Sequence, residues 1–252
     1  MMISQLVLHI PHSSLFIPAG IRRRFLVGEQ EIHENLLALT DWKTDELFAP
    51  GFTHRRVVYS FSRMVCDPER YRDDAEETMS RRGMGAVYLR DAFGRPLREA
   101  TPEEREALLR RCYDPHHRLL EAAVDAAIRE HGCCLIIDAH SFSAAPLPYE
   151  PDQHTDRPDI CLGTCPEHTP EPIFELASEH FRERGFSVAR NHPYAGTIVP
   201  LKYWGDRRVA SLMIEVNRKL YMEAGQMKKS SGFDAVKTAV GKFLELVVRI
   251  GQ

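Results

Sequence analysis

The chain has 252 residues, 43% of them hydrophobic and 27% charged, and its 33 Lys and Arg against 36 Asp and Glu give a formal net charge of −3. This composition is typical of a globular protein and excludes long disordered segments, and the balanced charge leaves no basic footprint for nucleic acid or a membrane surface. We therefore expect one domain over residues 1–252, with a small soluble molecule as its partner.

Strand and helix patterns alternate along the chain. In chain order they predict a strand at 5–10, one or two helices over 29–48, a strand at 55–63, a helix over 102–131, strands at 133–137 and 159–164, a helix over 171–185, strands at 186–190, 196–200 and 210–218, and a last helix over 231–250. Asp41 is the expected N-cap of a second helix in the first helical segment, and Pro115 should kink or divide the long one. This alternation predicts an α/β fold with three layers, α/β/α, around a central mixed, mostly parallel sheet.

Two polar, turn-rich stretches, residues 64–100 and 144–158, interrupt the alternation. We expect both to be long loops over the edge of the sheet. Loops of that length in a compact domain usually carry function, so both should border a binding site.

The lack of a recognisable targeting signal and the use of cysteine predict a cytoplasmic protein. No run of 18 apolar residues predicts a membrane-spanning helix, and the N-terminal residues lack the pattern of a secretory signal peptide. Cys133 and Cys134 lie in an apolar run, where reduced cysteines behave as small hydrophobic residues. Cys161 and Cys165 form a single C-x3-C without a second pair, which disfavours a structural zinc site.

Ionisable side chains occur at the ends of three predicted strands. His12 follows the first strand, Asp138 and His140 follow the apolar run CCLII, and Glu215 lies within ASLMIEVNR. The strand ends of an open α/β sheet converge on one crevice, so residues that are far apart in the sequence can meet there. These side chains are therefore expected to form one site.

Two histidines and a carboxylate, with a fourth position left for water, are common protein ligands of a hydrolytic zinc ion. His12 and His140 would supply the nitrogen ligands, and Asp45 in the polar segment TDWKTDELF would supply the oxygen. Asp41 and Glu46 compete with Asp45 for this role, because spacing alone does not separate the three acids.

Glu215 has apolar neighbours on both sides in a strand expected to be buried, where an unpaired carboxylate is costly. A general base gains from partial burial, because desolvation raises its pKa toward neutrality. Arg63 and Arg218 follow apolar strands, where a guanidinium fork can bind a substrate carboxylate through two hydrogen bonds. Ser13 and Ser141 are further candidates for contact with the substrate.

Each of these residues also has a purely structural interpretation. A histidine at a strand end can simply bind a loop, and Asp138 is expected to orient a ligand by accepting a hydrogen bond. Glu215 can be the ion-pair partner of one of the two arginines, and His116 and His117 fit a surface or supporting position on a helix. A nucleophilic serine is disfavoured, because neither candidate lies in a G-x-S-x-G elbow.

Seven short blocks of the sequence form a pattern through their order and spacing along the chain. They are HIPHSS (9–14), LTDWKTDELF (39–48), SRMVCDPER (62–70), DAHSFS (138–143), DICLGT (159–164), AGTIVPLKYWG (195–205) and IEVNRKLYM (214–222). In this order and spacing, which covers nearly the whole chain, they resemble the N-formylglutamate amidohydrolase family. The resemblance implies a phosphorylase/hydrolase-like fold related to zinc carboxypeptidases, and one Zn²⁺ per chain. It also implies hydrolysis of the amide of an N-acyl amino acid, typically N-formyl-L-glutamate to formate and L-glutamate.

By position, the resemblance assigns His12, Asp45 and His140 as metal ligands, Glu215 as the base and Arg63 as the arginine that faces the substrate carboxylates. In the mechanism that this implies, the metal lowers the pKa of water and polarises the scissile carbonyl. Glu215 takes the proton of that water and returns it to the leaving amine, while Arg63 stabilises charge on the substrate or the developing oxyanion.

Two places depart from the family pattern. Ser14 replaces the glycine expected after PHS, and Pro68 and Glu69 replace the Leu and Asn of a DLNR ending. The first change restricts the backbone of the ligand loop and the second adds a charge beside the expected specificity loop, so another N-acyl amino acid or a small peptide-like amide is an alternative substrate. Two alternative functions are a binding or regulatory protein that kept the scaffold and lost catalysis, and a zinc carboxypeptidase that acts on short peptides.

Overall fold

The computed structural model describes residues 6–49 and 55–250 of the chain. In these residues, six strands form one sheet in the order β2-β1-β3-β6-β4-β5. Their bounds are β1 Leu6–Ile10, β2 Arg55–Val58, β3 Cys134–Phe142, β4 Ile160–Gly163, β5 Val188–Arg190 and β6 Val209–Asn217. The strands β2, β1, β3 and β6 run parallel to one another, whereas β4 is antiparallel to β6 and parallel to β5. The predicted mixed, mostly parallel sheet is confirmed.

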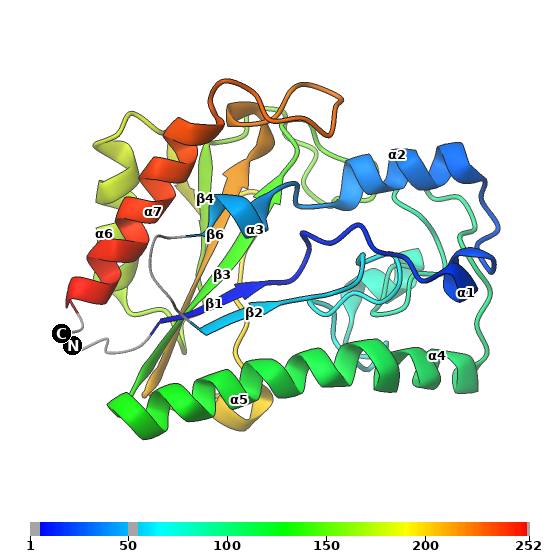
Figure 1. Cartoon of the computed structure of the whole chain (residues 1–252), viewed down its shortest axis with the longest axis horizontal. Helices are drawn as coiled ribbons and strands as arrows, with labels where there is room; N and C mark the ends of the chain where they lie inside the picture. The colour runs from blue at the N-terminus through cyan, green and yellow to red at the C-terminus, as the bar shows by residue number, and fades with distance from the viewer. Residues whose placement is uncertain (1–5, 50–54, 251–252) are drawn as a thin grey trace.

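Helices cover both faces of this sheet. Their bounds are α1 Ala19–Arg22, α2 Glu29–Leu39, α3 Thr44–Leu47, α4 Pro102–Leu108, α5 Asp114–His131, α6 Glu171–Arg182 and α7 Phe233–Ile250. The helices α6 and α7 lie on one side of the sheet, and α5 runs along the other side (Figure 1). None of the helices in the described part of the chain is long and apolar enough to cross a membrane.

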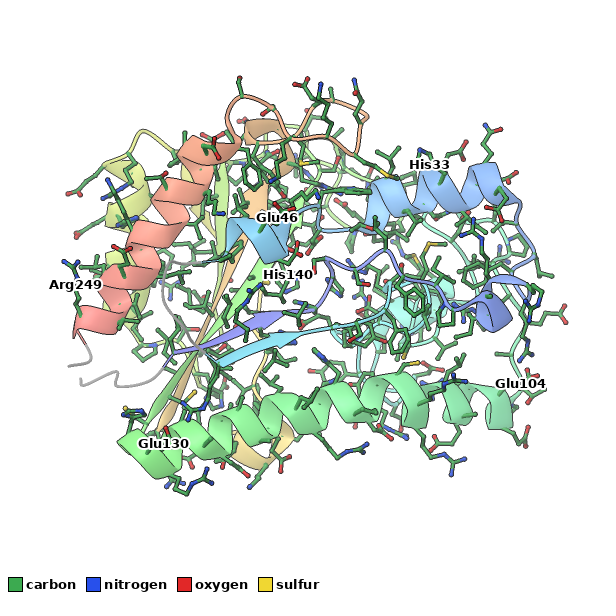
Figure 2. All side chains as sticks on the ribbon, in the orientation of Figure 1. His33, Glu46, Glu104, Glu130, His140 and Arg249 are labelled. Atoms are coloured by element: carbon green, nitrogen blue, oxygen red, sulfur yellow. The ribbon has the colours of Figure 1, made fainter. Side chains whose placement is uncertain are left out.

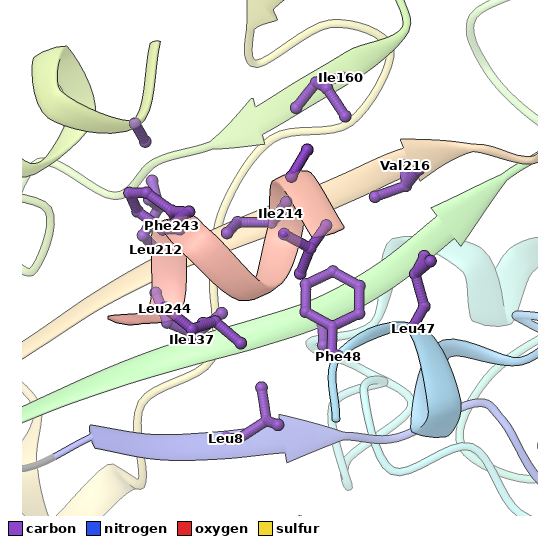
Figure 3. Close-up of a cluster of buried hydrophobic side chains, with 14 of the residues drawn as sticks. Leu8, Leu47, Phe48, Ile137, Ile160, Leu212, Ile214, Val216, Phe243 and Leu244 are labelled. Carbon is purple, nitrogen blue, oxygen red and sulfur yellow. The ribbon is translucent and has the colours of Figure 1, made fainter. Parts of the chain in front are cut away.

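The central strands are buried on both faces because successive side chains of a strand point in opposite directions. Leu8, Ile137 and Ile214 pack toward α7, where Figure 3 shows them around Phe243 and Leu244. The alternate residues of the same strands, including Val7 and Ile136, pack toward Val124 of α5. The apolar core therefore has two layers, one on each side of the sheet.

The strand that begins at Cys134 is longer than predicted. It was expected to end at residue 137, but it continues through Phe142 because it pairs with β6 up to Asn217. Asp138 and His140 are therefore strand residues on the α5 side of the sheet, and His140 lies directly beside Glu215 in the register. Two ionisable side chains are thus fixed by the ladder of the sheet itself.

Other predictions differ from the structure in detail. The predicted strand at 196–200 is wrong, because side chains bind its backbone: Ile198 N donates to Asp138 Oδ2, and its carbonyl accepts from Ser211 Oγ. The predicted strand at 55–63 ends at Val58, and Gln5, the first residue of the first predicted strand, lies outside the described residues.

The helical segments also differ. The predicted long helix is divided by a π-helical turn over Leu109–Tyr113, after which Pro115 lies in the first turn of α5. Asp41 is not an N-cap: α2 ends at Leu39, and α3 begins only after Lys43, whose backbone adopts a left-handed conformation with φ of 61°. Asp41 therefore lies in the connection between two helices, and its side chain does not cap a helix.

Candidate active site

Two histidines and one aspartate converge at the carboxyl end of β3. His12 comes from the loop after β1, Asp41 from the connection between α2 and α3, and His140 from β3, and all three are buried. His140 Nδ1 lies 3.0 Å from Asp41 Oδ2, and His12 Nδ1 lies 3.6 Å from the same oxygen. His140 lies in the interior of the molecule, near α3 (Figure 2). We call His12, Asp41 and His140 the first cluster.

The second nitrogen of each histidine ring binds a different carboxylate. His140 Nε2 lies 3.0 Å from Asp138 Oδ1, and His12 Nε2 lies 2.8 Å from Asp67 Oδ1. Asp138 thus contacts a histidine of the first cluster, in the position expected for an orienting acceptor. Metal-binding histidines usually donate their other ring N–H to such a partner, which fixes the tautomer and the orientation of the ring.

The donor atoms of the first cluster fit a divalent metal ion. Its three ligand atoms lie within 4.8 Å of one another, and they comprise two imidazole nitrogens and one carboxylate oxygen. His12 Nδ1 is buried and has no hydrogen-bond partner, which is unfavourable for a ring nitrogen unless a cation binds it. The set matches the His and carboxylate ligands of hydrolytic zinc sites.

Asp41, the acid of this cluster, stays ionised without a metal. Burial alone would raise the pKa of Asp41, but contacts with His12 and His140 hold it below its usual range. Burial alone would lower the pKa of His140, but Asp138 and Asp41 hold it well above its usual range. A metal ion would therefore have to displace a proton from His140, so acid should weaken metal binding.

Asp45, the expected acidic ligand, does not lie in the first cluster, and Asp41 takes that place. The reason is the left-handed turn at Lys43, which starts a new helix and separates Asp45 from Asp41 by a change of chain direction. Asp45 is half-buried, and its carbonyl oxygen accepts from Arg56. Glu46, the other competitor, forms ion pairs with Lys43 and Lys229.

The segment that carries Asp41 is held by the chain that follows β6. Arg218 donates from Nη1 to the carbonyls of Leu37 and Thr40 and from Nη2 to that of Ala38. The backbone N–H of Asp41 in turn donates to the carbonyl of His12. These bonds use three of the five N–H groups of the guanidinium, so Arg218 positions the segment with Asp41. Arg218 also borders the cavity described below, and its contact with a substrate stays a prediction.

Glu215 is buried beside His140 and has one unsatisfied oxygen. Its Oε2 has no hydrogen-bond partner, and neither Arg63 nor Arg218 binds its carboxylate. Burial raises the pKa of Glu215 to about 8, although His140 opposes the shift, with Asp41 and Asp138 adding to it. The carboxylate is therefore no structural ion-pair partner of an arginine, and its pKa suits proton transfer near neutral pH.

A cavity of about 370 Å³ opens onto His12, Asp41, His140 and Glu215. Both of the long loops predicted to border a site contribute to its wall, Arg70 from the first and Tyr149 from the second among them. The sheet thus supplies His140 and Glu215, and the connecting segments supply His12, Asp41 and the residues of the two long loops.

Two arginines, Arg63 directly before the first loop and Arg70 within it, line this cavity, and they differ in their contacts. Arg63 donates from Nε and Nη2 to Asp67 Oδ2, over 3.0 and 2.7 Å, and its Nε also lies 3.1 Å from Tyr88 Oη. Among the described residues Arg70 forms two long ion pairs, 3.8 Å to Asp67 and 3.6 Å to Glu77, and its buried Nε has no hydrogen-bond partner. Of the two guanidinium groups, that of Arg70 therefore has more N–H groups available to a substrate.

Asp67 and Arg70 escaped the reasoning from sequence because the loop that holds them has no periodicity. Asp67 is fully buried and binds His12, Arg63 and Tyr88 Oη. Burial alone would raise its pKa, but Arg63 and His12 hold it well below its usual range. The signal that could have found it was an acid directly after the apolar run MVC, between two arginines.

The remaining candidates are placed as follows. Ser141 lines the cavity, whereas Ser13 does not. Within residues 6–49 and 55–250 neither serine is hydrogen-bonded to a histidine, so a serine–histidine pair is not formed. Cys161 and Cys165 belong to no metal-ligand group of the described residues. His116 is buried, not exposed, and its Nε2 lies 2.8 Å from His9 Nε2.

The chain has relatives both in sequence and in fold. The family model of N-formylglutamate amidohydrolase matches residues 4–222. The crystal structure of N-formylglutamate amidohydrolase from Ralstonia eutropha JMP134 is similar with a TM-score of 0.78 and 27% identity, over 100% of this chain and 94% of that chain. A gene product of Agrobacterium tumefaciens shares the fold with a TM-score of 0.70 and 17% identity, over 98% of this chain and 92% of that chain. No curated protein matches the chain.

Proposed function

Because the chain belongs to the N-formylglutamate amidohydrolase family, we propose that it is a zinc-dependent hydrolase of the amide bond in an N-acyl amino acid. The substrate that we assign first is N-formyl-L-glutamate, with formate and L-glutamate as products. The observation that carries the proposal is the presence of two unsatisfied groups at one cavity. His12 Nδ1 is a free ligand atom, and Glu215 Oε2 is a free base.

The first cluster would hold the zinc ion through His12, Asp41 and His140. When bound there, zinc would supply a Lewis acid that lowers the pKa of water and polarises the scissile carbonyl. Asp67 and Asp138 keep the two imidazole rings in the orientation that binding needs, because each accepts a hydrogen bond from one ring.

Glu215 acts as the general base and then as the general acid. Its place beside His140 brings the carboxylate to the same end of the cavity as the first cluster. The carboxylate takes a proton from the attacking water and returns it to the nitrogen of the leaving amine. A pKa raised by burial makes the carboxylate a stronger base than an ordinary glutamate, and makes its protonated form an acid that persists near neutral pH.

Arg70 binds a carboxylate of the substrate, and Arg63 assists it. N-formyl-L-glutamate carries two carboxylates, so a cavity for it needs uncommitted cations. The guanidinium of Arg70 makes no hydrogen bond within the described residues and lines the cavity, whereas two nitrogens of Arg63 are bound to Asp67. A guanidinium with free N–H groups can bind a carboxylate through two parallel hydrogen bonds.

The size of the cavity favours a small N-acyl amino acid over a peptide. A volume of about 370 Å³ lies at the low end of the range for small-molecule sites, roughly 300–1,000 Å³. The unsatisfied base likewise favours an enzyme over a protein that only binds, because a buried carboxylate oxygen without a partner is costly and brings no advantage to simple binding.

The test is formate release from N-formyl-L-glutamate by protein purified without a histidine tag. The rate should be lost after treatment with a chelator and restored by zinc alone. N-formyl-L-aspartate, N-formyl-L-histidine and a set of dipeptides serve as competing substrates. Hydrolysis of N-formyl amino acids with little hydrolysis of dipeptides is the expected result, whereas release of free amino acid only from dipeptides would make the protein a carboxypeptidase. No metal-dependent release from any of them would leave the binding protein as the better account.

A further inference from the structure

A second group of ligand atoms lies next to the first cluster. His9 Nδ1 lies 2.8 Å from Asp138 Oδ1 and 3.3 Å from Glu69 Oε1, and the three ligand atoms lie within 4.8 Å of one another. His9 and Asp138 are fully buried. We propose that His9, Glu69 and Asp138, called the second cluster below, bind a second divalent metal ion. This inference goes beyond the proposed function and does not depend on it.

The orientation of His9 matches that of the two histidines in the first cluster. In all three rings, Nδ1 points toward carboxylate oxygens, while Nε2 is bound to a different side chain. The partner of Nε2 is Asp67 for His12, Asp138 for His140 and His116 for His9. When the Nε2–H of such a ring is held by a neighbour, Nδ1 carries the lone pair that can bind a metal, and metal-binding histidines usually have their other ring N–H held in this way.

A proton on His9 Nδ1 does not give both carboxylates of the second cluster a hydrogen bond. If His9 Nδ1 carries a proton, that proton is directed to Asp138 over 2.8 Å, and Glu69 Oε1 at 3.3 Å receives no hydrogen bond. Glu69 Oε1 is indeed buried without a hydrogen-bond partner. A cation between the three atoms would bind His9 Nδ1, Asp138 Oδ1 and Glu69 Oε1 together, including the oxygen that has no partner.

Asp138 has the capacity to take part in both clusters. Its Oδ2 accepts from the backbone N–H of Ile198, and its Oδ1 faces His140 and His9 together. A carboxylate oxygen has two acceptor positions, so Oδ1 can keep its bond to His140 Nε2 and offer the other position to a cation. An ion in the second cluster would therefore hold the residue that orients His140.

The cavity supplies a route to the second cluster. Glu69 lines the cavity, while His9 and Asp138 lie behind it in the sheet. A metal ion can thus enter from the same cavity as the substrate, and water can complete its coordination from that side. One imidazole nitrogen and two carboxylate oxygens suit Zn²⁺, and they also suit Mn²⁺.

Calorimetric titration of chelator-stripped protein with zinc chloride tests the second cluster. The parent should bind two equivalents of zinc per chain. Glu69→Gln removes the charge of one ligand of the second cluster and should bind one equivalent, as should His12→Ala in the first cluster. The combined variant should bind none. Glu76→Gln is the matched control, because Glu76 is exposed in the same loop and should leave both equivalents intact.

Glu69 is the residue of choice because it is only partly buried, so its replacement should not unfold the protein. One equivalent in the parent that Glu69→Gln retains and His12→Ala removes would overturn the second site and leave the proposed function intact. One equivalent that Glu69→Gln removes and His12→Ala retains would uphold the second site and contradict the ligands proposed for catalysis. Two equivalents that persist in Glu69→Gln would overturn the second site as drawn.

Discussion

Near their carboxyl ends, β3 and β6 carry apolar side chains on one face of the sheet and ionisable side chains on the other. On the face toward α7, Ile137, Ala139, Ile214 and Val216 continue the apolar core. On the face toward α5, Asp138, His140 and Glu215 are ionisable, and His140 lies beside Glu215 in the register. A shift of one position along the same strand therefore separates the side chains that stabilise the fold from those that carry the chemistry.

The two faces also differ in how burial is compensated. An apolar side chain needs only contact with its neighbours, whereas a buried polar side chain needs a partner for each polar atom. Asp138 has such partners in His9, His140 and Ile198 N. Glu215 Oε2 and His12 Nδ1 have none. These two atoms are the ones assigned to the base and to the metal.

The largest effect is expected on the ionisable face. Glu215→Gln removes the base with little change in shape, so turnover of N-formyl-L-glutamate should fall by about 10²–10⁴-fold. Zinc content and the free energy of unfolding should stay close to those of the parent, because the carboxylate makes no hydrogen bond through Oε2. Stopped assays of formate release, zinc content by elemental analysis and urea denaturation measure the three quantities.

Glu223→Gln is the control for this change, because Glu223 is exposed shortly after β6 and should keep full turnover. Parental turnover in Glu215→Gln would remove Glu215 from the mechanism.

The opposite outcome is expected on the apolar face. Leu212 is fully buried in the core toward α7, so Leu212→Ala should lower the free energy of unfolding by about 2–5 kcal/mol. Turnover per folded molecule should be unchanged, since the side chain points away from the face with Glu215. Urea denaturation and kcat at a temperature where the variant is folded measure these effects. A variant that kept its stability and lost turnover would break the separation between the two faces.

A smaller effect is expected from a change of Asp67, the loop residue that binds His12 Nε2. Asp67→Asn keeps the shape of the acceptor beside His12 Nε2 but removes its charge, so zinc affinity should fall by about 10–100-fold. Competition with a chromophoric chelator measures the affinity. Asp156→Asn, at an exposed position, is the control. An unchanged affinity in Asp67→Asn would show that the contact between Asp67 and His12 does not tune the metal site.

The smallest effect is the expected dependence of kcat/KM on pH. A base works when deprotonated, so kcat/KM should rise with pH through the pKa of Glu215 and level off above it. Burial raises that pKa from 4.5 to about 8 in the absence of metal, and a bound cation lowers it again, so the midpoint should lie between these values. The profile from pH 5 to 9 measures it, with zinc content determined at each pH. A rate that falls as pH rises over this range would contradict the role of Glu215.

The sequence was sufficient to predict the layers of the fold and the approach of His12, His140 and Glu215 to one another. Alternating elements define a sheet, and the ends of its parallel strands meet at one edge. His9 was not recognised as a candidate, because it lies inside a strand that reads as ordinary β-sheet. Its significance depends on Glu69 and His116, which are distant in sequence.

The acidic member of the first cluster could not be chosen from sequence. Asp41 and Asp45 are four residues apart in the same polar segment, and the choice depends on the left-handed turn at Lys43 and on the bonds from Arg218 to the carbonyls at the end of α2. Such contacts join residues that are 178 to 181 positions apart. No local pattern reports them.

The most direct test of the account compares Asp41→Asn with Asp45→Asn. Both variants are stripped of metal, supplied again with zinc and assayed for formate release from N-formyl-L-glutamate. If His12, Asp41 and His140 hold the metal that amide hydrolysis requires, Asp41→Asn should lose nearly all of the zinc-restored rate and Asp45→Asn should keep it. A zinc-restored rate that survives in Asp41→Asn and is lost in Asp45→Asn would contradict the site described above.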